Sequence, residues 1–304
     1  MVKLNIDLPD GFLNEEVRCG YTVTKQMKEV WAVELDILEQ LKTICEKYNL
    51  TYVGSGGTML GAIRHQGFIP WDDDIDIDMS REDYDRLCEV AEKEFKYPYF
   101  FQTEYTDKGT MRGHAQIRRT DTTAILNSEN NKVKFNQGIF IDIFPQDNIP
   151  DEKNELKKYI SDIVWYKKIS GAINRYSNYK IIENEKSSRL AKKILYPVFL
   201  MLHVSNIDTW LYKKMEKCAR KYKDIETKKV AGVTFLPERE KIRFQSEYLK
   251  ETISVRFEFT TIKVSAIYKS ILTQMYGDYT KFVLGESQHG ETFFDTDRSY
   301  INYI

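Results

Sequence analysis

Aspartates occupy every second position from Asp72 to Asp78, and Ile75 and Ile77 separate the last three of them. Because successive side chains of a strand point to opposite faces, this alternation predicts a strand with carboxylates on one face and isoleucines on the other. Carboxylates this close together repel one another and should not all ionise at neutral pH. A divalent cation resolves the conflict, and Mg²⁺ prefers one or two carboxylates together with substrate phosphates. The segment therefore predicts a metal and phosphate site on a strand.

A glycine turn stands just before this strand. Ser55, Gly56, Gly57 and Thr58 link a short expected strand to an expected helix that ends near His65. The first turn of a helix leaves backbone N–H groups unpaired, and glycines let a phosphate come close to them. Gly-Gly alone is more typical of an ordinary strand-to-helix turn, and the Gly-Lys-Ser/Thr sequence of a Walker loop is absent. The turn predicts phosphate binding because the aspartates stand beside it.

The acidic segment has other interpretations. It could form a solvated acidic edge, or a charge cluster ahead of the helix that Ser80 is expected to cap. A calcium loop would need glycine at its sixth position and glutamate at its twelfth, where this chain has Met79 and Asp85. The alternating isoleucines favour a buried strand over a solvated loop.

A third carboxylate, Asp142, lies in the otherwise almost wholly apolar sequence GIFIDIFP, which predicts a buried strand. A buried carboxylate costs several kcal/mol unless it is paired or bound to a metal. One interpretation is a salt bridge to Arg118 or Arg119. The other, which we favour, is that Asp142 completes a triad with Asp74 and Asp76.

The composition limits the classes of protein to which the chain can belong. Its 304 residues can form one large domain or two, and 45 basic against 46 acidic residues create no field that would attract nucleic acid. The longest apolar run, residues 194–202, is far shorter than the ~20 residues of a membrane span, and the first residues contain no apolar signal core. Four scattered cysteines indicate neither a zinc site nor a disulfide framework. We therefore expect a cytoplasmic protein without a transmembrane segment.

Hydrophobic periodicity changes near residue 150. Before it, helical spacing predicts helices at 24–48 and 80–95 around several strands, which indicates an α/β catalytic core over residues 1–150. After it, Lys-rich amphipathic patterns predict a mainly helical region over residues 151–304, which we expect to complete the core and to contribute the acceptor site. The further expected elements are strands at 51–53, 74–79, 98–102, 114–120, 122–127, 138–144, 228–235 and 253–262, and helices at 58–65, 151–170, 187–203, 206–222 and 264–276.

The glycine turn, the D-x-D strand and the later aspartate together resemble the nucleotidyltransferase superfamily. Residues 57–77 are similar to the signature of the LicD family of phosphocholine transferases, which is related to fukutin. Residues 138–145 resemble that family's second block and residues 275–279 its C-terminal block, so that the similarity covers roughly residues 25–280. The resemblance implies a nucleotidyltransferase-like mixed sheet with flanking helices.

The resemblance also implies a reaction, in which phosphocholine passes from CDP-choline to a sugar hydroxyl of a lipopolysaccharide or teichoic acid precursor and CMP is released. Asp74 and Asp76 would bind Mg²⁺ or Mn²⁺, and Asp142 would be a third ligand or the base that takes the hydroxyl proton. The metal would neutralise charge as the attacking and leaving oxygens exchange in line. Aromatic faces would hold the quaternary ammonium of choline. The aromatic candidates near the motifs are Phe68, Trp71, Phe140, Phe144 and Tyr276.

The resemblance implies that the glycine turn and Arg64 hold the pyrophosphate of CDP-choline. The Arg64 guanidinium is a planar hydrogen-bond donor that stays charged at neutral pH. Gln116 stands where the family often has lysine, so that phosphate neutralisation would fall to Arg118 or Arg119. His114 is a candidate for lining the pocket. The residues implied for phosphate binding are Ser55, Gly56, Gly57, Thr58, Arg64, His65 and Arg118.

Several alternatives stay open. Another CDP-alcohol phosphotransferase, or an enzyme that transfers a nucleotidyl or AMP group, would use the same residues. A non-catalytic nucleotide-binding or glycan-binding module is disfavoured, because it has no reason to keep three costly carboxylates together. The expected partners are CDP-choline and a glycan or lipid-linked glycan acceptor. The expected helix at 187–203, with Lys192 and Lys193 beside an apolar face, either packs in the core, as Pro197 favours, or makes peripheral contact with the inner face of a membrane.

Overall fold

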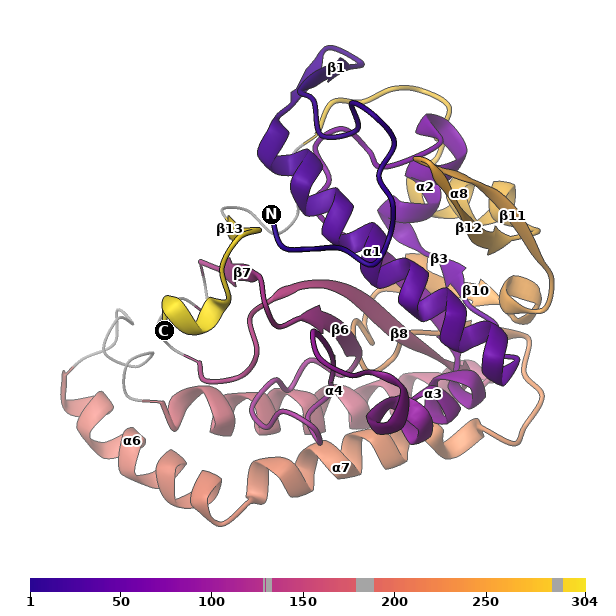
Figure 1. Ribbon diagram of the computed structural model, residues 1–304. Coiled ribbons are helices and arrows are strands. Elements are labelled where there is room, and N and C mark those ends of the chain that lie inside the picture. Colours follow the sequence, from indigo (N-terminus) through magenta and orange to yellow (C-terminus); the bar gives the residue numbers. More distant parts are fainter. Residues whose placement is uncertain (128, 130–132, 179–188, 286–291) are drawn as a thin grey trace.

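The expected apolar strand, β8 (Ile139–Ile149), is the central strand of a mixed sheet (Figure 1). The computed structural model describes residues 1–127, 129, 133–178, 189–285 and 292–304. β4 (Asp76–Ser80) runs parallel to β8, whereas β6 (Ala115–Arg119) and β9 (Lys229–Ala231) pair with it in the antiparallel sense. The side chains of β8 are almost all buried, which explains why its sequence is a nearly continuous apolar run.

Seven strands among the described residues form this sheet, in the order β10-β9-β8-β4-β3, and β5 joins it through β6. Three further pairs of strands lie outside the sheet, namely β1 with β2, β7 with β13 and β11 with β12. The bounds of the remaining strands are β1 (Glu16–Arg18), β2 (Tyr21–Val23), β3 (Val53–Gly54), β5 (Tyr99–Gln102), β7 (Thr123–Leu126), β10 (Arg243–Gln245), β11 (Thr252–Phe257), β12 (Thr260–Ser265) and β13 (Thr292–Asp295).

Helix α1 (Lys25–Tyr48) carries the apolar stripe that the sequence predicted and buries it in the main core. Thr24 caps its N-terminus by accepting a hydrogen bond from the Met27 N–H, and Asn49 ends it in the left-handed conformation, with a φ of 53°. The other helices are α2 (Gly56–His65), α3 (Arg81–Glu94), α4 (Lys153–Tyr176), α6 (Arg189–Val204), α7 (Ile207–Ala219) and α8 (Tyr268–Tyr276), with short 3₁₀ helices η1 (Arg220–Tyr222), η2 (Glu240–Ile242), η3 (Ser246–Leu249) and η4 (Tyr300–Asn302).

Helices α4, α6 and α7 form a layer along one edge of the molecule (Figure 1). Ile163 of α4 and Met215 of α7 pack with Ile149 of β8 and Ala231 of β9 in a second apolar cluster. The helices after residue 150 are therefore seated on the central sheet itself.

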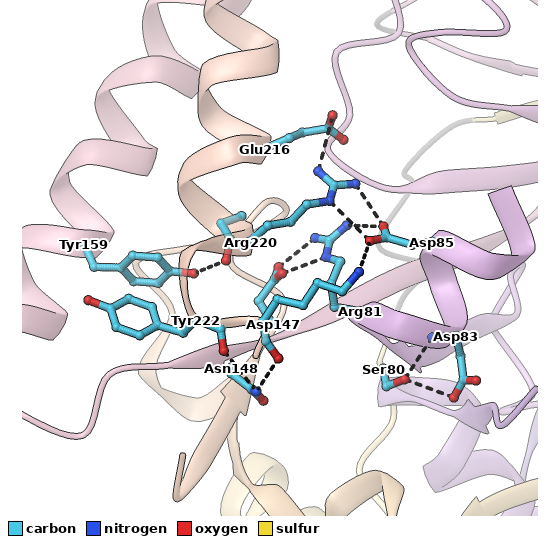
Figure 2. A network of polar contacts seen from close by, with 12 residues as sticks. Ser80, Arg81, Asp83, Asp85, Asp147, Asn148, Tyr159, Glu216, Arg220 and Tyr222 are labelled. Carbon is cyan, nitrogen blue, oxygen red and sulfur yellow. Dashed lines mark hydrogen bonds and ion pairs between the residues drawn. The ribbon is translucent and has the colours of Figure 1, made fainter. Parts of the chain in front are cut away.

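A buried polar network fastens the same layer to α3 (Figure 2). Arg81 donates two hydrogen bonds, each 2.7 Å long, to Asp147, and the two side chains are 4% and 1% exposed. Arg220 donates to Asp85 at 3.0 Å and lies 3.6 Å from Glu216 of α7. The buried Arg81–Asp147 pair joins α3 to β8, and the half-buried Arg220–Asp85 pair joins the segment after α7 to α3.

The prediction of an α/β fold with a mixed sheet and flanking helices is confirmed, although some elements differ from expectation. The acidic strand begins at Asp76 and not at residue 74. The expected strand at 253–262 is instead the hairpin of β11 and β12, because Glu258 at its tip has a φ of 54°. A hydrogen bond of 2.7 Å from Arg18 to the Glu258 carboxylate holds that tip in place.

The helix expected at 187–203 corresponds to α6, whose described part begins at Arg189 and contains Pro197. Residues 187 and 188, together with the side chains of Lys192 and Lys193, lie outside the described part of the chain. No helix in the described part of the chain has both the length and the hydropathy needed to span a membrane.

Candidate active site

The three aspartates of the expected triad lie together at the centre of the sheet. Asp76 and Asp142 occupy paired positions on the parallel strands β4 and β8, and such side chains point to the same face. Asp74 lies two residues before β4, and oxygen atoms of Asp74, Asp76 and Asp142 lie within 4.8 Å of one another. This spacing lets one cation contact all three carboxylates.

The electrostatics of the triad suit a bound cation. Burial, and then the charges of Asp74 and Asp142, raise the pKa of Asp76 well above its ordinary value. Burial and the neighbouring aspartates also raise the pKa of Glu34 in α1, and one of its carboxylate oxygens is buried without a hydrogen-bond partner. A divalent cation would remove the repulsion, and a set of carboxylate oxygens is the donor set that Mg²⁺ and Mn²⁺ prefer. The residues present therefore fit the expected metal.

The last aspartate of the alternation, Asp78, supports the glycine turn. Its buried carboxylate accepts hydrogen bonds of 2.8 Å from Ser55 Oγ and from the hydroxyl of Tyr248. Burial raises the pKa of Asp78 to about 6, although hydrogen bonds from Ser55, Tyr248 and Gln146 act in the opposite direction. Asp78 thus connects the acidic strand to the turn that precedes α2.

The glycine turn places the N-terminus of α2 beside the triad. Gly56 has a φ of +50°, which favours glycine, and a Cβ atom there would lie 3.3 Å from Oδ2 of Asp76. A Cβ atom at Gly57 would lie only 2.6 Å from Oδ2 of Asp72. The first backbone N–H groups of α2 can therefore reach a phosphate that also contacts a cation on the triad.

Gly57→Ala is expected to lower kcat/KM for the donor at least tenfold, because the new methyl group must displace the Asp72 carboxylate. Gly171→Ala is the matched control, since a Cβ atom at that helical position would meet no atom within 4 Å. Steady-state kinetics and chemical denaturation of both variants provide the measurement. Equal kcat/KM values for Gly57→Ala and Gly171→Ala would contradict the close approach at the turn.

Two of the residues implied for phosphate binding lie at the far end of α2. Arg64 donates from Nε to Nε2 of His65 at 3.0 Å and from Nη1 to the carbonyl of Lys281 at 3.2 Å. Burial, and then the charge of Arg64, lower the pKa of His65 to about 4, so His65 is neutral at pH 7. Both side chains face the segment after α8, and their contact with phosphate remains a prediction.

Two other residues that the resemblance implies for phosphate binding, Thr58 and Arg118, lie inside the fold. Thr58 accepts the Asp76 N–H at 2.8 Å and so fixes the start of β4. Arg118 is buried in β6, where it donates to the side-chain carbonyl oxygens of Gln102 and Gln116, each at 2.6 Å. Contact of Arg118 with phosphate likewise remains a prediction.

The side chain of Asp142 contacts a histidine that directly precedes β6. His114 Nε2 lies 2.9 Å from Oδ1 of Asp142, and its ring packs against Phe144 and Phe235 at centroid distances of 4.5 and 5.0 Å. Arg119, one of the arginines considered for a salt bridge, pairs with Asp36 instead. His114 thus fixes the orientation of one Asp142 oxygen.

A cavity of about 210 Å³ joins the turn and the triad. Its wall includes side chains that the sequence analysis did not single out, among them Gln146, Phe235 and Arg239. Arg239 is the basic side chain among the lining residues, and it belongs to a charged turn that has no recognisable motif. Tyr276 also lines the cavity. The similarity of residues 275–279 to the family's C-terminal block had already indicated that this segment lies near the site.

Comparison with known proteins agrees with this geometry. Residues 49–170 match the family model described as LicD/FKTN/FKRP, nucleotidyltransferase domain. Residues 49–170 therefore form a LicD-family nucleotidyltransferase domain. The chain is 28% identical over 263 residues to the lipopolysaccharide cholinephosphotransferase LicD of Haemophilus influenzae, which covers 86% of this chain and 94% of that protein. An uncharacterized protein of Rickettsia prowazekii is 33% identical over 125 residues, which cover 40% of this chain and 44% of that protein. The LicD match contains the glycine turn and all three aspartates of the triad.

Proposed function

We propose that this chain is a metal-dependent transferase that moves phosphocholine from CDP-choline to a hydroxyl group of a cell-surface glycan precursor, with release of CMP. The observation that carries the proposal is the cavity in which the helix N-terminus after Ser55 meets the carboxylates of Asp74, Asp76 and Asp142. The similarity to a lipopolysaccharide cholinephosphotransferase along most of both chains supports the choice of phosphocholine. An acceptor of lipopolysaccharide or teichoic acid type, and a location at the cytoplasmic face of the membrane, are parts of the same proposal.

In this mechanism Asp74, Asp76 and Asp142 would hold Mg²⁺ or Mn²⁺, which when bound neutralises charge on the phosphates. The backbone N–H groups after Ser55 bind a donor phosphate. The acceptor hydroxyl oxygen forms a bond to the phosphorus that carries choline, the bond from that phosphorus to the CMP oxygen breaks, and CMP leaves with the electron pair. Asp142, oriented by His114, would take the hydroxyl proton as the alternative to binding the metal.

The cavity offers aromatic faces for the quaternary ammonium of choline. Of the five aromatic candidates from the sequence, Phe144 and Tyr276 line the cavity, and Phe235 adds a third ring. Phe68 instead stacks on Trp31 in the core, with 4.6 Å between ring centroids. A cation over an aromatic face gains ~0.5–2 kcal/mol, which favours choline over a polyol.

The donor is tested by comparing kcat/KM for CDP-choline, CDP-ethanolamine, CDP-glycerol and CDP-ribitol on one glycan acceptor. We expect CDP-choline to exceed the two polyol donors at least tenfold, because a polyol cannot use the aromatic faces and would need matched hydrogen-bonding groups. A tenfold preference for a polyol donor would replace the choline assignment. Transfer of AMP from ATP, measured in parallel, would support the nucleotidyl-transfer alternative.

A further inference from the structure

A second cavity, of about 590 Å³, adjoins the catalytic cavity. Its wall is formed on one side by α4, including Val164 and Gly171, and on the other by residues 235–239. Phe235, Leu236 and Arg239 line both cavities and form a wall that the two cavities share. A volume of this size lies within the ~300–1,000 Å³ range of small-molecule sites.

The shared wall is held in place by a half-buried lysine. Lys167 of α4 donates hydrogen bonds from Nζ to the carbonyl oxygens of Thr234 at 2.7 Å and Phe235 at 2.5 Å. Burial lowers the pKa of Lys167 to about 8. Because this contact ties residues 234 and 235 to α4, the cavity is formed before a ligand arrives.

The cavity is apolar inside and basic at its edge. Val164, Phe235, Leu236 and Pro237 contribute apolar surface. At the edge, Glu238 lies 3.7 Å from Lys168 and offsets its charge, and Lys167 and Arg239 leave the lining basic on balance. A ligand with a hydrocarbon body and a phosphate group matches both features.

The surface next to the cavity is also apolar. Residues three or four apart are neighbours on a helix, so Lys168 stands beside Trp165, which is 54% exposed. Ile169 follows on the same helix, and α6, which packs against α4, exposes Leu195, Val198 and Met201. Exposed aromatic and aliphatic side chains interspersed with lysines are typical of surfaces that rest on anionic lipid.

We propose that the second cavity binds the hydrocarbon chain of a phosphate-bearing lipid acceptor, so that the headgroup end of that lipid reaches the catalytic cavity past Phe235 and Arg239. This inference rests on the proposed function for the identity of the reaction, but the binding site is defined independently by the cavity. Both an acyl chain and an isoprenoid chain share the required chemistry.

Gly171 provides a sharp test, because a Cβ atom there would meet nothing within 4 Å and the position is helical. Gly171→Leu should occupy part of the cavity with its larger side chain, and Gly171→Ala should leave most of it open. Both replacements raise helix propensity, so both variants should be at least as stable as wild type, which chemical denaturation checks.

Calorimetric binding of dodecyl phosphate, below its micelle concentration, is compared with that of ethyl phosphate and of geranyl phosphate. We expect wild type and Gly171→Ala to bind dodecyl phosphate at least tenfold more tightly than Gly171→Leu, and ethyl phosphate to bind all three proteins weakly and equally. The relative affinities of dodecyl and geranyl phosphate distinguish acyl from isoprenoid chains. Equal affinity of dodecyl phosphate for Gly171→Leu and wild type would overturn the proposal.

A kinetic comparison separates this inference from the proposed function. Gly171→Leu should slow transfer to a lipid-linked glycan at least tenfold and leave both transfer to a chain-free glycan and hydrolysis of CDP-choline unchanged. If wild type shows neither transfer to either glycan acceptor nor hydrolysis of CDP-choline, the proposed function is refuted. The lipid cavity is not refuted by that result, since alkyl phosphate binding is measured without turnover. Equal transfer to both acceptors by wild type and Gly171→Leu would refute the lipid cavity alone.

Discussion

Asp76→Asn is expected to lower kcat at least ~100-fold, or about 2.7 kcal/mol in activation free energy, while the protein stays folded. Ligand oxygens of Asp74, Asp76 and Asp142 lie within 4.8 Å of one another, so that the substitution removes one of three expected ligands. We expect Asp74→Asn to have a similar effect. Steady-state kinetics with saturating Mg²⁺ provide the measurement.

The stability of the same variant gives an independent readout. An acid whose pKa is raised in the folded state binds extra protons there, so metal-free wild type should lose stability as pH rises from ~4 toward the raised pKa of Asp76. Asp76→Asn removes one titrating carboxylate, and we expect it to be at least as stable as wild type at pH 7 without metal and to gain less from Mg²⁺. Denaturant midpoints with and without Mg²⁺, at pH 5 and pH 8, measure both effects.

Asp162→Asn, on the exposed surface of α4, is the matched control and should change neither kcat nor the response to Mg²⁺. Activity of folded Asp76→Asn within threefold of wild type would argue against the metal site. Undiminished stabilisation of that variant by Mg²⁺ would argue against the same site from binding alone.

Arg81→Met is expected to destabilise the protein by ~3–5 kcal/mol, because it leaves the buried Asp147 carboxylate without its ion-pair partner. Asp147 is 1% exposed, and the two hydrogen bonds from Arg81 join α3 to β8 at the centre of the polar network (Figure 2). Although burial lowers the pKa of Arg81, the charge of Asp147 raises it above its ordinary value overall. Chemical denaturation at pH 7 measures the difference.

The same helix offers the control. Arg86 pairs with Glu89 at 2.8 Å, but their side chains are 54% and 64% exposed, so Arg86→Met should cost at most ~1 kcal/mol. Arg81→Met combined with Asp147→Leu should recover much of the lost stability, since an apolar pair often replaces a buried ion pair without cost. Equal losses for Arg81→Met and Arg86→Met would show that the buried pair is not a structural link.

The local elements that the sequence predicted well have strong periodic signals. The helical stripe of residues 24–48 became α1, and the apolar run around Asp142 became β8, because burial of one face or of both faces imposes a matching pattern on the side chains. The hairpin of β11 and β12 was predicted as one strand. Its turn contains a left-handed residue, but that residue is Glu258, held by its distant partner Arg18, and no glycine marks the turn in the sequence.

The sequence also contained the essentials of the candidate site. The alternation from Asp72 to Asp78 and the single charge in β8 carry a physical cost that only pairing or metal binding can relieve, so the triad could be inferred without coordinates. The different role of Asp78 could not, because its partner Tyr248 follows 170 residues later.

The sequence by itself predicted the α/β class, the resemblance to the LicD family and the three candidate aspartates, because strand alternation and buried charge are local properties. Only the tertiary structure decided that Arg64 and His65 face the segment after α8, that His114 contacts Asp142, and that Arg239 enters the cavity. The same holds for the second cavity, whose walls come from α4 and from residues 235–239. Contacts between segments far apart in the chain depend on how helices and strands pack, and packing constrains volume and polarity without leaving a periodic signal in either segment.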